Sequence, residues 1–352
     1  MNMPSAQRLS SLGLFLAALV VGLVGLELGL RIWLSTEKLA QWPNFVLQAR
    51  SVHDEREQAR MVHDPLLGYA PRPLHAAPGV TFDADGLRLN GDAPDGDKAR
   101  TILAVGDSYT FGDEITDGET WPAHLQRLTG RRTLNAGVSG YGFDQSVLRA
   151  ERLASTSGPS LIVVSFIADD IRRTELSRIW GAEKPHFEID GEQLTLGNAQ
   201  VPPRPQAQDT LNFWQRTLGY SYLVDFVLRR LNLMHDWFGD HVRVHPAGTG
   251  ERIACLLTSR LAELKRSSGA DVVLLAQYDP VVWQSEAFAA EQRQMTQRLL
   301  ACAEARGLRT IDSFDALAAQ QDDGGPAGLY VLWHMNDRGN RLIAELVASM
   351  LI

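Results

Sequence analysis

The residue of this chain best suited to chemistry is a serine that directly follows a short apolar run. Residues 101–105 are Thr-Ile-Leu-Ala-Val, and the string Gly106-Asp107-Ser108-Tyr-Thr-Phe-Gly comes next. A side chain at the carboxyl end of a parallel strand projects into the crevice where α/β sheets bind their ligands. The backbone N–H groups of the turn and of the following helix could stabilise a developing oxyanion there. The same string also fits an ordinary strand-to-helix turn, in which Asp, Ser and Gly make local hydrogen bonds.

A nucleophilic serine needs a base, because its free hydroxyl is a weak nucleophile. Of the nine histidines, His334 follows the last expected strand and precedes Asn336 and Asp337, either of which could cap the final helix. In a doubly wound sheet this loop returns to the crevice at the end of the first strand. His334 is therefore predicted to meet Ser108, although a histidine at a helix start is often only a surface or capping residue.

The elements that must position these two residues alternate between strands and helices. Short apolar runs typical of strands buried on both faces occur at residues 101–105, 133–138, 161–168, 271–278 and, more weakly, 309–314. Between and after them, apolar residues recur at helical spacing, as in residues 253–264 and 342–350. This alternation predicts an α/β domain whose central parallel sheet carries helices on both faces.

An insertion at roughly residues 174–247 interrupts the alternation. Its second half, from Leu211 to Trp237, has the apolar spacing of an amphipathic helix. The insertion could cover a substrate groove, or it could be a packing embellishment of the domain.

Three strings of the chain together resemble the sequence blocks of the SGNH (GDSL-type) hydrolases. The string around Ser108 is similar to their first block, and Asn135-Ala-Gly-Val-Ser-Gly140 is similar to the second. His334-Met-Asn-Asp-Arg-Gly339 is similar to the last block, whose histidine leads into the C-terminal helix. The strings occur in the order of the family, and the likeness covers about residues 99–352.

The resemblance implies a three-layer, flavodoxin-like α/β/α fold and a serine esterase or acyltransferase that needs no cofactor. Ser108 would be the nucleophile, His334 the base, and the N–H of Gly140 would serve the oxyanion hole. Asp107, Gly137, Asp170 and Asn336 lie in the same blocks and would support the site; Asp107 is expected to bind backbone amides and shape the turn. The resemblance further implies an acylated substrate, most often an O-acetylated carbohydrate, and extends to the membrane-anchored bacterial members of the family.

The third block departs from the family pattern. The family has Asn-Asp where this chain has Asp169-Asp170, and the Asn side chain normally donates a hydrogen bond to the oxyanion. An ionised carboxylate accepts hydrogen bonds but cannot donate them. Asp169 is therefore expected to be a modified oxyanion position, able to donate only if burial or Asp170 keeps it protonated.

The last block departs as well. The family has an aspartate three residues before the histidine, and this chain has Val331. The imidazole of His334 could then be held by a backbone carbonyl or by another acid. Asp312, Asp322 and Asp323 are the candidates nearest in the sequence.

Composition excludes several classes of protein. The chain has 34 basic and 42 acidic residues, a formal net charge of −8, and no basic run, which argues against nucleic-acid binding. It has no His-x-x-His or Cys-x-x-Cys pair and no glycine-rich phosphate loop, so neither a metal nor a cofactor is expected.

Cys255 and Cys302 lie in helix-like stretches. They are interpreted as two small buried apolar residues, with a disulfide as the alternative if the domain lies outside the cytoplasm.

The N-terminus contains one stretch that could cross a membrane. No charge occurs from Leu9 to Leu26, and the apolar character continues to Leu34, which is long enough to span a bilayer. A cleaved signal peptide is the main alternative, but the small-x-small cleavage site is missing. Glu27 and Arg31 are four residues apart and can pair on one helix face. Basic residues flank the stretch almost equally on both sides, so the positive-inside rule gives little guidance on orientation.

The sequence thus predicts a tail and membrane anchor at 1–34, a stalk and lead-in at 35–98, and a hydrolase-like domain at 99–352. The stalk is expected to be helical, and the lead-in after it is rich in Pro and Gly, which favour turns and short strands. The domain is placed outside the cytoplasm, on a single-pass anchor in the inner membrane. Two functions stay open: an esterase or acyltransferase acting on an acylated glycan, and a catalytically impaired domain that binds glycan or helps to assemble a complex.

Overall fold

A computed structural model describes residues 5–49, 60–203, 211–231, 233–320 and 326–351. Two compact units form, and each is described by itself. The first unit comprises residues 1–56 and 205–241, and the second comprises residues 57–204 and 242–352. Residues 205–241 therefore belong to the first unit, although the chain on both sides of them belongs to the second.

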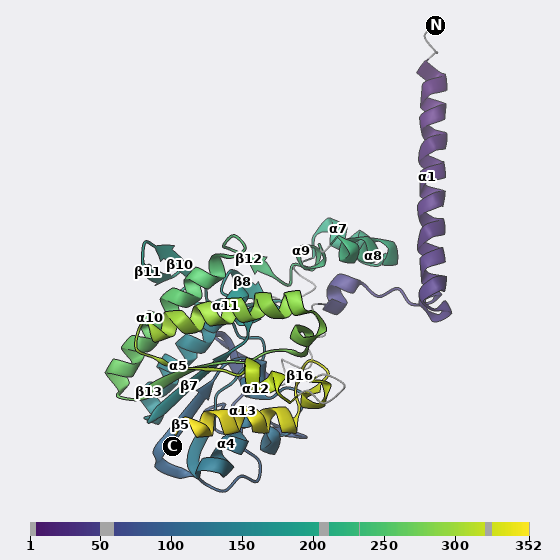
Figure 1. Cartoon of the computed structure of the whole chain (residues 1–352). Helices are drawn as coiled ribbons and strands as arrows, with labels where there is room; N and C mark the ends of the chain where they lie inside the picture. Colours follow the sequence, from purple (N-terminus) through teal and green to yellow (C-terminus); the bar gives the residue numbers. More distant parts are fainter. Residues whose placement is uncertain (1–4, 50–59, 204–210, 232, 321–325, 352) are drawn as a thin grey trace. The chain divides into compact units, whose positions relative to one another are not determined.

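The core of the second unit is a five-stranded parallel sheet of order β6-β5-β7-β13-β14 (Figure 1). This order is that of flavodoxin-like folds, as expected. The predicted apolar runs form its strands, and every residue of the central strand β7 is buried. The strands are β5 (Asp97–Val105), β6 (Arg131–Asn135), β7 (Leu161–Phe166), β13 (Asp271–Ala276) and β14 (Arg309–Asp312).

Helices cover the sheet in two groups. Helix α4 (Trp121–Thr129) packs on α13 (Asp337–Ser349), while α10 (Thr249–Ser268) packs on both α5 (Phe143–Ser157) and α11 (Glu286–Glu304). The chain is thus an α/β protein with the sheet between helices. Short helices follow several strands: α3 (Ser108–Phe111), α6 (Ala168–Arg173) and α12 (Phe314–Ala318), with 3-10 turns η2 (Asp117–Glu119), η4 (Pro280–Gln284) and η5 (Pro326–Leu329).

In the second unit the lead-in forms short hairpins. Its many Pro and Gly residues, which interrupt helices and strands, are typical of such turns. Strands β1 (Met61–Asp64) and β2 (Gly68–Pro71) pair antiparallel, as do β3 (Ala76–Ala77) and β4 (Val80–Thr81). The helical stalk expected before the lead-in is described only in part, as the 3-10 turn η1 (Thr36–Leu39) and one turn at residues 45–49. Residues 50–59 lie outside the described chain.

The insertion contributes to both units. Its first half forms β8 (Leu176–Ile179), β9 (Ala182–Glu183), β10 (Phe187–Asp190) and β11 (Gln193–Leu196), and β12 (Val242–Arg243) pairs with β8. The expected helix at 211–237 is divided into α7 (Phe213–Leu218), α8 (Tyr222–Arg230) and α9 (Met234–Phe238). The periodicity was right, but Gly219 ends α7 and the Ser221 hydroxyl caps α8, which breaks the helix.

The N-terminal helix α1 (Ser5–Leu34) is the main element of the first unit. Gly13–Leu34 has a mean hydropathy of 2.2 and is long and apolar enough to cross a membrane. By length and composition alone, a signal sequence would pass the same test.

Cys255 and Cys302 form a disulfide between α10 and α11, with their Cα atoms 5.4 Å apart. The interpretation of the two cysteines as small unpaired residues is therefore wrong. Each cysteine packs in a helical environment, as expected, but the pairing of α10 with α11 brings the two together, and this was not readable from the sequence.

Replacing both cysteines by serine should lower the free energy of unfolding by about 2–4 kcal/mol, because the bond closes a long loop in the unfolded chain. Urea unfolding of the full chain with and without a thiol reductant measures this effect. The reductant should destabilise the parent chain and leave the double variant unchanged. Equal stability of the two oxidised proteins would contradict the prediction.

Candidate active site

Ser108 is the first residue of α3 and directly follows the β5 strand and its turn. The Asp107 side chain caps this helix by accepting the N–H of Tyr109 at 3.0 Å, as the sequence predicts. The Ser108 hydroxyl lies 3.4 Å from Asp107 Oδ2, and Ser108 is 7% exposed. The Ser108 N–H stands in the first helical turn, where backbone donors have no intrahelical acceptor. Among the described residues it donates to no protein acceptor, so it is available to an oxyanion.

The second block brings two glycines to this end of the sheet. A Cβ at Gly137 would collide with the backbone N of Phe111, 2.2 Å away, so only glycine allows the segment to pass α3 this closely. Gly140 has a φ of +78°, in the region that favours glycine. Within the described residues, the Gly140 N–H donates to no protein acceptor. It therefore remains available as a second oxyanion donor.

The two aspartates of the third block point to different partners. Asp170 is buried, accepts the N–H of Ile167 at 3.0 Å and binds Arg173 at 2.6 Å. Asp169 is half-exposed and forms an ion pair with Arg172 at 2.6 Å. Arg172 also binds Glu291 on α11 at 3.0 Å. Asp169 thus presents a carboxylate engaged by a cation at the position where the family has an amide.

Arg173 joins the first, second and third blocks. Its guanidinium lies 2.6 Å from Asp170 and 3.8 Å from Asp107, and it donates to the carbonyl of Tyr141 at 2.9 Å. Burial raises the pKa of both carboxyl groups, and the positive charge of Arg173 opposes that rise. Asp107 and Asp170 therefore support the turn and the block arrangement rather than reach solvent.

His334 lies on β16 (His334–Met335), which pairs with β15 (Tyr330–Val331) in a hairpin before α13. β16 contacts α3, and the Tyr109 ring is 5.2 Å from the imidazole. The Tyr109 hydroxyl also donates to the carbonyl of Trp333 at 2.7 Å. The hairpin is thus fixed to the serine's helix, although no hydrogen bond joins Ser108 to His334 among the described residues.

Glu114 is the acid that faces the histidine. Its Oε1 lies 3.3 Å from His334 Nδ1, a nitrogen that is shielded from solvent. The two groups are close enough for an ion pair but are not aligned as a hydrogen bond in this structure. Glu114 Oε2 accepts the backbone N–H groups of Trp333 at 3.2 Å and His334 at 3.3 Å. One carboxylate therefore holds both the backbone and the ring of the histidine.

The sequence did not indicate Glu114. It follows the first block by a few residues, in a segment without apolar periodicity, and its contact with His334 joins residues 220 positions apart. The acids considered from the sequence have other roles or places. Asp312 accepts the hydroxyl of Tyr278 at 2.8 Å, and Asp322 and Asp323 lie outside the described residues.

Arg88 of the lead-in fixes the loop that carries Glu114. Its buried guanidinium donates to the carbonyls of Phe111, Gly112 and Ile115 at 2.6–2.7 Å and to Asp117 at 2.8 Å. Glu114 has a φ of +71°, which is unfavourable for a residue with a Cβ. The arginine bonds on both sides of Glu114 hold it there.

Asn336 caps α13 by accepting the N–H of Gly339 at 3.0 Å, and it also binds the carbonyl of Gly328 at 3.0 Å. The predicted capping role of Asn336 is thereby confirmed. Val331 lies directly opposite His334 across the hairpin, and its side chain cannot replace an acid.

The model of the GDSL-like lipase/acylhydrolase family matches residues 104–342 of the chain. This match spans all the blocks described above. The chain belongs to the GDSL-like lipase/acylhydrolase family. The α/β fold with a central parallel sheet agrees with that assignment.

Several solved structures are similar to the chain at low sequence identity. They include LAE5, an alpha/beta hydrolase enzyme from the metagenome of Lake Arreo, Spain, with 16% identity, a TM-score of 0.43, and coverage of 74% of this chain and 97% of that one. TesA is 15% identical over 72% of this chain and 98% of its own, with a TM-score of 0.40. A variant of Axe2, an acetyl xylan esterase from Geobacillus stearothermophilus, is 14% identical over 72% of this chain and 95% of its own, with a TM-score of 0.43. No curated protein matches the sequence.

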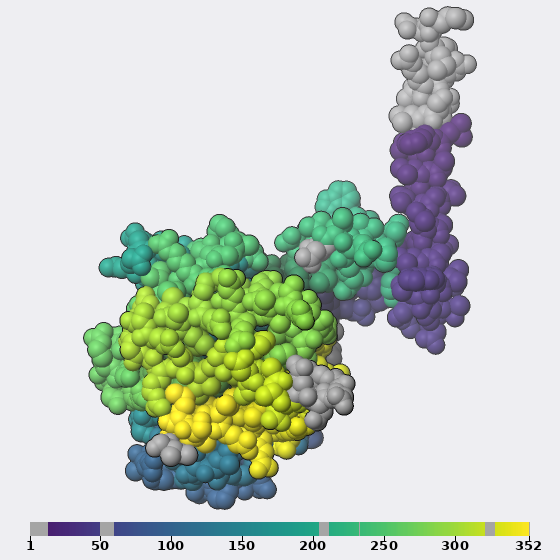
Figure 2. Space-filling view, in the orientation of Figure 1, coloured from purple at the N-terminus to yellow at the C-terminus, as the bar shows by residue number. Residues whose placement is uncertain are grey.

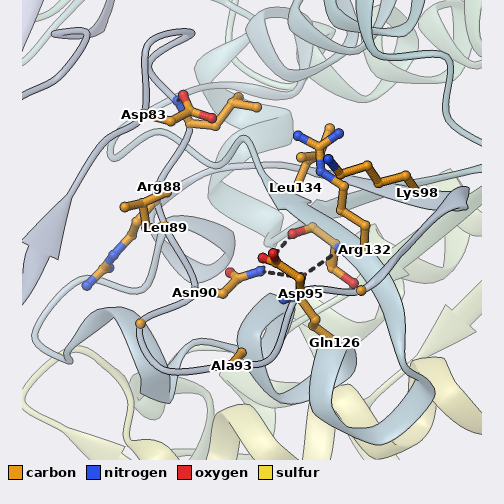
Figure 3. Close-up of a pocket in the computed structure, with 14 residues that line it drawn as sticks. Asp83, Arg88, Leu89, Asn90, Ala93, Asp95, Lys98, Gln126, Arg132 and Leu134 are labelled. Atoms are coloured by element: carbon orange, nitrogen blue, oxygen red, sulfur yellow. Dashed lines mark hydrogen bonds between the residues drawn. The ribbon is translucent and has the colours of Figure 1, made fainter.

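A surface cavity of about 230 Å³ lies elsewhere in this GDSL-family domain, between the lead-in and the β6 edge of the sheet (Figure 3). Figure 3 shows Asn90, Asp95 and Gln126 beside Arg132 and Lys98 at this cavity. None of the residues that the family blocks supply lines it, so the cavity is separate from the candidate active site.

One cluster of side chains in the first unit could hold a cation. His235, Asp240 and His241 offer ligand atoms within 4.8 Å of one another. The Nδ1 atoms of both histidines lie 3.2 Å from Asp240 Oδ1, so the carboxylate is within ion-pair distance of two imidazoles. None of these three residues belongs to the sequence blocks that the chain shares with the family.

Proposed function

We propose that this protein is a serine ester hydrolase in which Ser108 is the nucleophile, His334 the general base and Glu114 the acid that orients it. The observation that carries the proposal is the Glu114–His334 contact, because it supplies the acid missing at position 331. The Ser108 N–H and the Gly140 N–H form the oxyanion hole. The contacts of Glu114 with His334 and the family to which the chain belongs support these roles.

The reaction follows from this arrangement. His334 Nε2 removes the proton of the Ser108 hydroxyl as Oγ attacks the ester carbonyl carbon, and the carbonyl oxygen becomes an oxyanion held by the two N–H groups. The proton then passes from His334 to the leaving alkoxide as the ester bond breaks, leaving an acyl-serine. Attack by water, with His334 again as base, releases the acid and restores Ser108; attack by another hydroxyl would transfer the acyl group instead.

We extend the proposal to an acylated, O-acetylated glycan outside the cytoplasm. The family resemblance supports this substrate class. The disulfide between Cys255 and Cys302 supports the location, because disulfides persist in oxidising compartments.

The same proposal keeps α1 in the mature protein as a single inner-membrane anchor. Arg31 is fully buried and donates to the carbonyls of Lys38, Gln41 and Tyr220 at 2.7–2.8 Å. Its guanidinium also lies 3.6 Å from the ring centre of Trp42. These contacts between the end of α1 and later residues support its retention in the mature protein.

The alternative is a catalytically impaired member of the family that binds glycan or assembles a complex. The ion pair between Asp169 and Arg172 favours it, because the third oxyanion donor is absent. The full chain in detergent, treated with a serine-reactive phosphonate and with p-nitrophenyl acetate, separates the two. Covalent labelling of Ser108 with ester turnover supports the enzyme; no label and no turnover would leave the binding protein.

Asp169→Asn should raise kcat/KM for p-nitrophenyl acetate by roughly 10-fold or more, because an amide can donate to the oxyanion and one such donor is worth about 10²–10³ in rate. The matched control is Glu291→Gln, which weakens the same Arg172 pairing without adding a donor at position 169. It should leave the rate within a few-fold of the parent. A fall to background in Asp169→Asn would show instead that the carboxylate has a chemical role of its own.

A further inference from the structure

Helices α7 and α8 of the first unit expose an unusual set of large apolar side chains. Phe213, Trp214 and Leu231 are 61–68% exposed, and three further side chains are at least 40% exposed. Large apolar side chains gathered on a surface mark a contact with a partner or a membrane. We call this set the α7–α8 apolar surface: Phe213, Trp214, Leu218, Phe226, Val227 and Leu231.

The N-terminal end of α8 is bound to α1. Glu27 of α1 accepts the backbone N–H groups of Tyr222 at 3.0 Å and Leu223 at 2.9 Å, and the hydroxyl of Ser221 at 2.8 Å. One turn later, Arg31 donates to the carbonyl of Tyr220 at 2.8 Å. Figure 2 shows the residues of α8 against this end of α1. The start of α8 is therefore held level with residues 27–31 of α1.

This level is where charged residues first interrupt the apolar stretch, near its end at Leu34. The charge-free stretch ends at Leu26, the residue before Glu27. Glu27 and Arg31 lie about 6 Å apart along the helix axis, at 1.5 Å per residue. When α1 crosses a bilayer, the start of α8 is thus placed where hydrocarbon gives way to headgroups.

The composition of the two helices suits that place. Arg216, Arg229 and Arg230 are exposed on the same helices as the apolar side chains. Helices that lie in the membrane interface combine Trp, Phe and Leu on one face with Lys and Arg on the other. Trp33, 75% exposed near the end of α1, is typical of the same interface.

We propose that the α7–α8 apolar surface lies in the headgroup–acyl boundary of the bilayer that α1 spans, and that its arginines face anionic lipid headgroups. The first unit is then a membrane-bound platform built from an anchor and an interfacial helix pair. This inference rests on the retained anchor of the proposed function, and it does not depend on catalysis.

The test uses the full chain in nanodiscs of zwitterionic and anionic phospholipid, one protein per disc. Both native cysteines are in the disulfide, so an introduced cysteine is the single free thiol. Val227→Cys and Leu231→Cys are labelled with an environment-sensitive fluorophore, and Arg229→Cys, about 160° from Val227 around the axis of α8, is the matched control. Intact mass shows whether residues 1–34 are present.

Lipids with a nitroxide on the upper acyl chain should quench the labels at 227 and 231 several-fold more than the label at 229, and aqueous iodide should show the reverse order. Equal quenching at all three sites would overturn the proposal. Labels protected from iodide but not quenched by the nitroxide lipids would show that protein, and not lipid, covers these positions, and would overturn it too. Loss of residues 1–34 would overturn both the anchor and the interface, whereas absence of esterase activity would not alter the quenching.

Discussion

Replacing Ser108 by alanine is expected to abolish ester hydrolysis. The hydroxyl is the attacking atom in the proposed reaction, and in serine hydrolases its removal lowers kcat by up to about 10⁶-fold. We expect kcat/KM for p-nitrophenyl acetate to fall by on the order of 10³-fold or more, to the level of the residual oxyanion stabilisation. The same variant should take up no phosphonate. Initial rates and intact-mass spectrometry measure the two effects.

The matched control is Ser155→Ala, which removes an exposed hydroxyl on α5 that donates to the carbonyl of Arg152. It should retain both labelling and turnover. Ser108 is 7% exposed and packed into α3, so loss of one oxygen there should leave the unfolding temperature close to that of the parent. If Ser108→Ala and the parent hydrolysed the ester at the same rate, the assignment of the nucleophile would be wrong.

The fold was predictable because its determinants are local. Each strand of the sheet is a short apolar run, such as residues 161–166, and parallel strands buried on both faces produce this pattern whatever their neighbours are. The place of Ser108 at the start of α3 and the cap at Asn336 were predictable for a related reason. Each acts at the boundary of an element, and its role follows from the residues within three positions of it.

Glu114 and the disulfide were not predictable, because both depend on which elements pack together. Glu114 meets His334 only after the hairpin of β15 and β16 has folded onto α3, and nothing in the segment around residue 114 indicates this partner. Cys255 and Cys302 have separate helical surroundings, and the sequence does not say that α10 and α11 lie side by side. The separation of α7 from α8 likewise depended on Gly219, a single residue within a stretch of regular helical spacing.

The conformation of Glu114 is itself an argument for its role. A non-glycine residue at a φ of +71° costs about 1–3 kcal/mol, and such residues persist only where surrounding contacts enforce them. Here Arg88 supplies the contacts, with hydrogen bonds to the carbonyls of Gly112 and Ile115 on either side. Arg88 of the lead-in thus holds this loop in a strained conformation, and that conformation places the Glu114 carboxylate next to His334.

Replacing Glu114 by glutamine is therefore expected to lower kcat by on the order of 10²-fold or more, since loss of the orienting carboxylate costs about 10⁴ in well-studied serine hydrolases. Glutamine has the same shape, and its amide oxygen can still accept the N–H groups of Trp333 and His334. Only the negative charge facing Nδ1 is lost. The charge stabilises the imidazolium that forms as Ser108 gives up its proton, so kcat should fall while KM stays nearly constant.

The control is Glu119→Gln, which removes a charge from the same region, where Glu119 accepts the N–H and hydroxyl of Thr116. A general loosening of the loop would lower the activity of both variants, raise KM and lower the unfolding temperature. An orienting role predicts that the loss is confined to Glu114→Gln, appears in kcat and leaves the unfolding temperature unchanged. If Glu114→Gln turned over as fast as the parent, His334 would act without an acid partner, and the catalytic unit would be a Ser108–His334 dyad.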